Sequence, residues 1–248
     1  MNVLTIYAHH NPHSFCHAVV EHFDAGLRDA GHANEIVDLH AIGFDPVLGD
    51  ADGPNWIDDS VPDDVLAHMN LPQSLLERSR GPLQRLLLKR WIGALDARGL
   101  VRKMHAGGGP RDVAIQQRKV AAADALAFVS PLYFVGFPAM LKGWIERVFS
   151  LGFAFGLTAD GWRGDVNGRL PLLNHRKALI INTTIFDERS YASGLGDAMT
   201  RLIDDFALHY PGIREVRHEY FHAVHGADAA TRAAYLGRAY ALGRDFGD

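Results

Sequence analysis

The chain has 248 residues, of which 48% are hydrophobic and 22% are charged, and this composition excludes a disordered or fibrous protein. The formal net charge is −4, so no overall basic excess indicates nucleic acid or an anionic membrane as the main partner. The single cysteine, Cys16, excludes a disulfide scaffold and is compatible with a cytoplasmic location.

The chain opens with a predicted strand–helix–strand unit. Val3–Ala8 is a short apolar, β-rich run typical of a buried strand, without the features of a secretory signal. Ser14 is the expected N-cap of a helix that runs to about Asp29, and Glu35–Leu39 is a second strand. This order is the repeating unit of a parallel sheet.

Residues 44–110 interrupt the alternation. Phe44–Asp64 contains seven aspartates and no Lys or Arg, and we expect a surface loop there. Pro72–Met104 predicts one basic amphipathic helix, with eight Lys or Arg between Arg78 and Lys103. Such a helix can mark a membrane surface or a calmodulin-like partner. We favour a helix that packs on its own domain or on a second subunit, because one charged face is normal.

The alternation then resumes to the end of the chain. The expected helices and strands are Val113–Asp124 (helix), Ala125–Ser130 (strand), Ala139–Phe149 (helix), Lys177–Thr183 (strand), about Gly194–His209 (helix), Arg214–Ala223 (strand) and Asp228–Phe246 (helix). Five strands alternating with helices predict an α/β fold with a doubly wound parallel sheet. We therefore expect a single domain over residues 1–248, with a helical or loop insertion at 50–110.

Ligands of open α/β sheets bind beyond the carboxyl ends of the strands, which selects three loops here. These are His9–Phe15, Pro131–Phe137 and Thr184–Tyr191. A helix N-terminus at Ser14 suits a phosphate, and aromatic side chains in the second loop suit a flat ring. Taken singly, the threonines could reflect β propensity and the aromatic residues could belong to the core. The histidines near His9 lack accompanying carboxylates or cysteines, so we expect no metal site.

Several motifs resemble the NAD(P)H:quinone oxidoreductase family, the DT-diaphorase-like enzymes with a flavodoxin-like fold. Tyr7-Ala-His9 followed by Ser14-Phe15 is similar to the N-terminal motif of the family. The long run Pro131–Phe149 resembles its central signature, and Gly152–Phe155 and Thr183-Thr184 follow in the family's order. The resemblance covers about residues 1–48 and 113–225.

The resemblance implies a flavin, FAD in preference to FMN, and NAD(P)H as co-substrate. It assigns Tyr191 to catalysis and Phe155 and Leu157 to the acceptor pocket. The implied cofactor-binding residues are His9, Ser14, Phe15, Cys16, Pro131, Leu132, Tyr133, Phe134, Thr183, Thr184 and Phe186. It also implies a homodimer, because partner subunits complete the acceptor pocket in that family.

The resemblance implies hydride transfer, by a two-step relay through the flavin, from NAD(P)H to a quinone or related aromatic acceptor. The alternatives are reduction of a biosynthetic, nitro or azo aromatic compound, and a flavodoxin-like electron carrier. The chain departs from the family pattern in ways that affect the acceptor most. Ile185-Phe186 replaces Gly-Gly, Cys16 replaces an Asn, and no histidine follows Tyr191 where the family has one.

Overall fold

The computed structural model describes residues 1–248, and its centre is a five-stranded sheet in the order β2-β1-β3-β6-β7. All neighbouring strands in this sheet are parallel. This is the doubly wound, flavodoxin-like arrangement, as predicted from the alternation of strands and helices. The strands are β1 (Asn2–Tyr7), β2 (Ala33–Asp38), β3 (Ala125–Pro131), β6 (Lys177–Thr183) and β7 (Glu215–Phe221).

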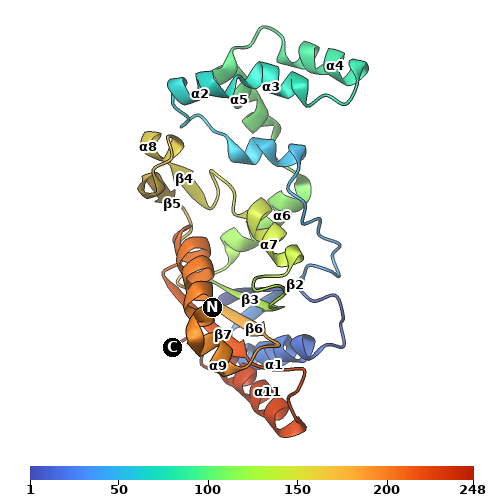
Figure 1. Cartoon of the computed structure of the whole chain (residues 1–248), viewed down its shortest axis with the longest axis vertical. Coiled ribbons are helices and arrows are strands. Elements are labelled where there is room, and N and C mark those ends of the chain that lie inside the picture. The colour runs from blue at the N-terminus through green and yellow to red at the C-terminus, as the bar shows by residue number, and fades with distance from the viewer.

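Helices cover both faces of the sheet (Figure 1). Helices α1 (Phe15–Asp29) and α11 (Ala229–Arg244) lie on one face and enclose one apolar core. The other face carries α6 (Arg111–Ala122), α7 (Ala139–Val148) and the π-helical η4 (Thr200–His209), which enclose the second core. Every residue of β3 and β6 is buried, which explains why both strands appear in the sequence as continuous apolar runs. No helix is both long and apolar enough to cross a bilayer.

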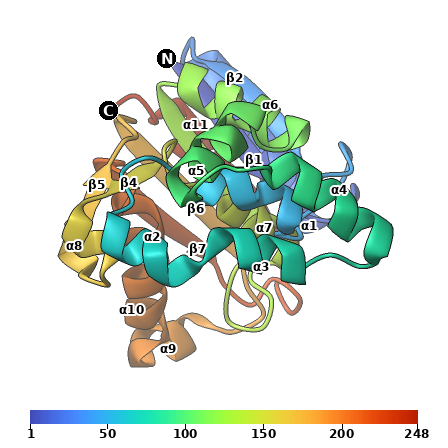
Figure 2. The ribbon, with the colours of Figure 1, turned by 90° about the horizontal axis from the view of Figure 1, so that it is seen from above.

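The segment between β2 and α6 forms a helical layer beyond α6 and α7, at one end of the molecule (Figures 1 and 2). The loop expected over Phe44–Asp64 instead contains η1 and the start of α2. The prediction of a single helix over Pro72–Met104 is also wrong. The elements are η1 (Asp50–Trp56), α2 (Asp63–Met69), α3 (Leu71–Glu77), α4 (Pro82–Ile92) and α5 (Ala97–Gly107).

Two glycines break the expected long helix. Gly81 precedes Pro82, which occupies the first turn of α4, and proline favours the start of a helix over its interior. Gly93 ends α4 with a φ of 62°, a conformation that glycine adopts without strain. The single helix expected over Pro72–Met104 is therefore divided into α3, α4 and α5.

Two further regions differ from the sequence prediction. Strand β4 (Phe155–Leu157) pairs antiparallel with β5 (Arg169–Pro171), with α8 (Ala159–Trp162) and η2 (Val166–Gly168) between them. The helix expected from Gly194 begins earlier, as α9 (Glu188–Ser190), η3 (Tyr191–Leu195) and α10 (Gly196–Met199) ahead of η4. Tyr191 thus starts a π-helical turn and does not lie in a loop.

A buried ion cluster joins the insertion to the sheet layers. The Arg147 side chain on α7 is 5% exposed, and its Nε lies 3.0 Å from Oδ1 of Asp52 in η1. Its Nη1 lies 2.7 Å from Oδ2 of Asp112 and donates to the Asp45 carbonyl at 2.6 Å. Asp52 also accepts from the Gly49 N–H at 2.9 Å. One guanidinium therefore connects α7, η1, α6 and the chain that follows β2.

We expect Arg147→Met to lower the free energy of unfolding by about 3–5 kcal/mol, because Asp52 keeps a buried charge without its partner. The double variant Arg147→Met/Asp52→Asn should recover part of this loss. Arg244→Met is the matched control, since Arg244 forms an exposed ion pair with Asp245, and such pairs contribute about 0–1 kcal/mol. Urea unfolding measures all three, and an Arg147→Met value as small as that of the control would contradict the assignment.

Candidate functional site

The strand register brings the three predicted loops to one edge of the sheet. Pro131 at the end of β3 is paired with Thr183 at the end of β6, and Thr183 is paired with Phe221. The loops also bond to one another. The Leu132 N–H donates to the Thr183 carbonyl at 2.9 Å, and the Tyr133 hydroxyl lies 3.5 Å from Nε2 of His9.

The first loop ends at the N-terminus of α1. Ser14 is the N-cap of α1, as predicted, and its hydroxyl accepts from the His17 N–H at 3.1 Å. The N–H groups of Phe15 and Cys16 have no acceptor and lie at the positive end of the helix. Nδ1 of His17 is buried without a hydrogen-bond partner. This arrangement of unpaired donors fits a phosphate.

His9 and Phe15 flank this helix start. Burial and the neighbouring His10 lower the pKa of His9, so its ring is largely neutral at pH 7 and acts through hydrogen bonds. The Phe15 ring lies 6.4 Å from Tyr235, and the Arg232 guanidinium lies 5.7 Å from the Phe15 ring centre. Arg232 adds a positive charge that the sequence analysis did not identify.

Cys16 does not belong to the exposed surface of this site. The residue is 2% exposed and packs in the core between the sheet and α1. Burial raises the pKa of its thiol to about 12, although a hydrogen bond with the Thr183 side chain opposes the shift. Its side chain is therefore neither an accessible cofactor contact nor a reactive thiolate, because the neutral thiol is a poor nucleophile.

The second loop is a tight hairpin turn with strained corner residues. Tyr133 and Gly136 exchange two backbone hydrogen bonds, at 3.0 and 3.2 Å. Between them Phe134 and Val135 have φ values of 47° and 62°, which bulky and β-branched residues rarely adopt. The Phe134 side chain is fully exposed and Tyr133 is half exposed, whereas Pro131 is buried and Leu132 half-buried. An exposed aromatic surface on strained backbone is characteristic of a ligand contact.

The third loop begins with two buried threonines. Thr183 and Thr184 are 5% and 2% exposed, and the Thr184 N–H already donates to the Phe221 carbonyl at 2.9 Å. The Thr184 hydroxyl donates to the Phe186 carbonyl at 2.7 Å. The N–H groups of Ile185 and Phe186 have no backbone acceptor, and the Phe186 side chain is 45% exposed. These two amides are the donors that the loop offers to a ligand.

Tyr191 lies beside this loop, in an aromatic cluster. Its ring centre is 4.7 Å from that of Tyr220 and 4.8 Å from that of His222, and the residue is 7% exposed. Burial raises the pKa of Tyr191, so its hydroxyl keeps its proton at neutral pH. Burial also lowers the pKa of His222, whose Nδ1 is buried without a partner. A neutral phenol and a neutral imidazole thus lie together at the edge of the site.

A buried polar network supports this cluster and was missed by the sequence analysis. Nδ1 of His218 lies 3.0 Å from Asp204, and its Nε2 lies 2.7 Å from Oδ1 of Asn182. Asn182 in turn donates to the Ser130 carbonyl at 3.0 Å, and the Tyr220 hydroxyl lies 3.1 Å from the His218 ring. A signal was present, because His218 and Tyr220 alternate along β7 and must share one face, and His222 follows at the next alternate position just beyond the strand.

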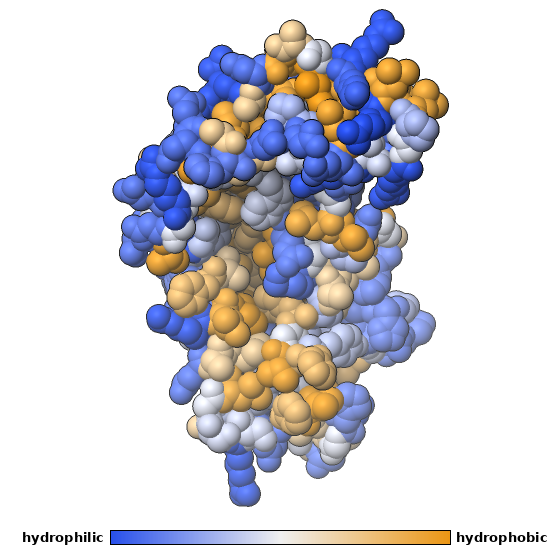
Figure 3. Space-filling model, turned by 45° about the horizontal axis from the view of Figure 1, so that its top comes forward, coloured by the Kyte–Doolittle hydropathy of each residue, from blue (hydrophilic) through white to orange (hydrophobic).

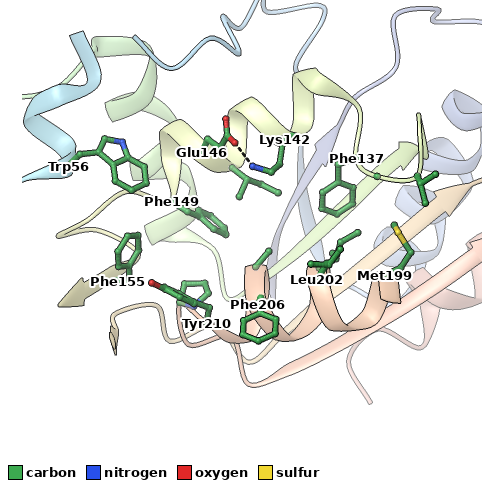
Figure 4. A pocket seen from close by; sticks show the side chains of 16 residues that line it. Trp56, Phe137, Lys142, Glu146, Phe149, Phe155, Met199, Leu202, Phe206 and Tyr210 are labelled. Carbon is green, nitrogen blue, oxygen red and sulfur yellow. Dashed lines mark hydrogen bonds and ion pairs between the residues drawn. The ribbon is translucent and has the colours of Figure 1, made fainter. Parts of the chain in front are cut away.

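An apolar cavity of about 530 Å³ adjoins the second loop (Figure 4). Phe155 lines it and makes edge-to-face contacts with Trp56 and Tyr210, at ring-centre distances of 6.0 and 5.3 Å. Lys142 and Glu146 of α7 form an ion pair in its wall. Leu157 is paired with Arg169 in the small sheet and does not line the cavity. The other lining residues are mostly apolar and include Val135, Gly136, Phe137, Phe149, Met199, Leu202, Ile203 and Phe206.

The geometry defines a class of protein: a doubly wound α/β protein whose carboxyl edge fits a planar cofactor with a phosphate. The N-terminus of α1, the exposed aromatic turn and the free amides of the third loop meet at that edge. No group of three His, Cys, Asp or Glu side chains is placed to hold a metal ion.

Comparison with known families agrees with this class. Residues 1–242 match the model of a family described as having a flavodoxin-like fold, and the chain belongs to that family. A ribosyldihydronicotinamide dehydrogenase-like protein of Penicillium crustosum is 28% identical over 217 residues, which are 86% of this chain and 69% of the relative. An NAD(P)H dehydrogenase [quinone] of Cavia porcellus is 28% identical over 215 residues, which are 85% of this chain and 64% of that protein. The matches thus span about two thirds of these relatives.

A solved structure shows the same fold over nearly the whole chain. The NAD(P)H:quinone oxidoreductase of Methanothermobacter marburgensis superposes with a TM-score of 0.70 and 24% identity. The alignment covers 99% of this chain and 98% of that one. The helical layer is thus compatible with the flavodoxin-like framework.

Two substitutions in the second loop separate the effect of its strained backbone on stability from the effect of its exposed aromatic ring. We expect Val135→Gly to stabilise the protein by about 1–3 kcal/mol, because glycine adopts positive φ without strain. Phe134→Ala should leave the free energy of unfolding within about 0.5 kcal/mol of wild type, since the ring is fully exposed. Thermal and urea unfolding measure both effects. A destabilised Val135→Gly protein would contradict the strain.

Proposed function

We propose that the protein is a flavin-dependent NAD(P)H oxidoreductase that reduces a quinone or a related aromatic acceptor. The observation that carries the proposal is the meeting of three ligand-type loops at one sheet edge, with an apolar cavity beside them. The names of the relatives, which are dehydrogenases and quinone oxidoreductases, support the same class of reaction. The expected cytoplasmic location stays a prediction.

Different residues at the edge would contact different parts of a flavin. His9, Ser14 and the first turn of α1 would hold the phosphate end, and Pro131 to Phe134 would lie along the ring system. Ile185 and Phe186 would offer their N–H groups to its polar edge. When bound, the flavin supplies two-electron transfer between NAD(P)H and an aromatic acceptor. We favour FAD over FMN, because Phe15 and Arg232 add an aromatic face and a cation beyond the phosphate position.

The cavity favours an enzyme over an electron carrier. An acceptor needs a site that excludes water beside the cofactor, whereas a carrier needs only an exposed cofactor edge. Here about 530 Å³ of apolar space adjoins the second loop, within the usual range for a small-molecule site. Its lining is aromatic and almost without charge, which suits a quinone or another flat aromatic compound. A nitro or azo aromatic acceptor has the same surface chemistry and is the second candidate.

Two measurements test the function. Mass spectrometry of the cofactor released from purified protein should give FAD, and steady-state oxidation of NADH and NADPH should depend on an added acceptor. A panel of benzoquinones, naphthoquinones, azo dyes and nitroaromatics then ranks the acceptors. Bound flavin without acceptor-dependent turnover would favour the carrier, and failure of FAD and FMN to bind would refute the proposal.

We also propose a homodimer whose partner covers the apolar cavity. Phe134, Val135, Leu202 and Phe206 are 104%, 54%, 65% and 45% exposed. The last three line the cavity, so they form one apolar surface across the second loop and η4. Patches of this kind on soluble domains mark contacts with other proteins. A partner on this surface would close the acceptor site.

Light scattering at micromolar concentration should therefore give twice the chain mass. Leu202→Glu/Phe206→Glu should give the single-chain mass and reduce turnover, because two charges in an apolar interface are costly to desolvate. Leu170→Glu/Leu172→Glu is the matched control, since both leucines are exposed on or next to β5, outside the cavity. A fully active wild-type monomer would exclude a dimeric site.

Tyr191 is the side-chain donor to test for catalysis. Tyr191→Phe keeps the ring contacts with Tyr220 and His222 and removes only the hydroxyl. We expect unchanged flavin content and a turnover at least about tenfold slower, because one lost donor to a developing anion commonly costs roughly 10²–10³ in rate and water can replace part of it. Stopped-flow measurement of each half-reaction checks this. Rates within about twofold of wild type would leave the backbone amides of the third loop as the only donors.

A further inference from the structure

Helix α4 presents an apolar ridge that nothing in the chain covers. Leu83, Leu87 and Trp91 are four residues apart and so share one face, here called the α4 ridge. They are 70%, 58% and 38% exposed, and Leu86 beside them is 63% exposed. The buried face of the helix is the opposite one, where Ile92 is 7% exposed. Helix α4 therefore has one apolar face that packs on the protein and a second apolar face that is exposed to solvent.

The surroundings of the α4 ridge are strongly basic. Residues 78–95 contain five Lys or Arg and no Asp or Glu. Of these, Arg78 lies 3.6 Å from Asp50. The four that form no ion pair and are exposed are Arg80, Arg85, Lys89 and Arg90. Lys103 of α5 donates to the Trp91 carbonyl at 2.5 Å and lies 4.8 Å from the centre of its ring. Leucines and a tryptophan are thus surrounded by uncompensated positive charge.

The charges argue against a second copy of the chain as the occupant. Two α4 ridges in contact would bring eight unpaired cations together without a carboxylate between them. The aspartates of the same helical layer are already engaged, since Asp59, Asp63 and Asp64 pair with Arg102, Arg98 and Arg163. The occupant must therefore bring its own negative charge together with an apolar surface.

The position of α4 favours a flat occupant over a peptide in a groove. The helix projects at the end of the molecule farthest from α11 (Figure 1), and Figure 3 shows apolar surface bordered by hydrophilic surface at that end. A convex helix with leucines, a tryptophan and flanking Lys and Arg has the chemistry of an interfacial membrane helix. We propose that the α4 ridge and its cations bind this protein to the surface of an anionic phospholipid membrane.

This binding is peripheral and does not require a spanning segment. The apolar ridge would enter the boundary between headgroups and acyl chains, and the cations would remain at the level of the lipid phosphates. The α4 ridge lies outside the cavity and outside the cofactor loops. Membrane binding can therefore be tested independently of turnover and of the proposed function.

The test is co-sedimentation of the full-length protein with vesicles. We expect binding to vesicles of phosphatidylcholine mixed with phosphatidylglycerol at low salt, weaker binding at high salt, and none to phosphatidylcholine alone. Arg80→Gln/Lys89→Gln/Arg90→Gln should weaken binding by roughly a hundredfold, about fivefold for each cation. Leu83→Ser/Leu87→Ser should also weaken binding at least about tenfold, because less apolar surface would be buried in the membrane.

A matched control removes the same charge elsewhere. Arg118→Gln/Arg176→Gln/Arg214→Gln also removes three exposed cations without ion pairs and should bind as wild type does. Trp91 fluorescence gives a direct signal, because it should shift to the blue on binding and this shift should be absent in Trp91→Phe. Circular dichroism confirms that each variant is folded.

Three outcomes would overturn the proposal. The first is that wild type does not bind the anionic vesicles at low salt, and the second is that the α4 variants bind like the control. The third is that the protein does not bind vesicles but self-associates, or captures an acidic amphipathic peptide, in a way that the α4 substitutions abolish. That last result would assign the ridge to a protein partner.

Discussion

The parallel register of β1, β3 and β6 is the constraint on which the rest of the structure depends. These strands are buried on both faces, so each residue is fixed by apolar packing above and below the sheet as well as by its neighbours. A shift of one residue would exchange the faces of the whole strand, and the two cores would not form. The register therefore holds Tyr7, Pro131 and Thr183 at one edge, and the loops that follow them become one site.

The site combines a rigid support with locally unfavourable features. The Asp204–His218–Asn182–Ser130 network is buried and hydrogen-bonded, and the aromatic rings around Tyr191 pack together beside it, so both support the edge. Above it, Phe134 is fully exposed on strained backbone and the amides of Ile185 and Phe186 are unpaired. A ligand that covers the ring and accepts from the amides would compensate for both features. Because the loops are already held in place by the fold, little free energy would be spent on ordering them when the ligand binds.

The sequence predicted the central strands and the three loops because buried strands and cap residues leave local patterns. Ser14 and Lys177–Thr183 were identified in this way. The insertion was predicted poorly, because Gly81 and Gly93 break a charge and leucine pattern that is otherwise continuous. The burial of the Cys16 side chain and the helical position of Tyr191 were not predicted, because both depend on tertiary packing, namely the core under α1 and the early start of the helix after β6. The contacts of Arg147 join residues far apart in sequence and leave no periodic signal.

The central claim is that the carboxyl edge of the sheet holds a flavin that NAD(P)H reduces. Anaerobic mixing of the flavin-loaded protein with NADH or NADPH in a stopped-flow spectrophotometer tests it most directly. The account predicts that the absorbance of the oxidised flavin disappears in a single turnover and returns when a quinone is added. Flavin that stays oxidised with both nucleotides, although it is bound stoichiometrically, would contradict the account.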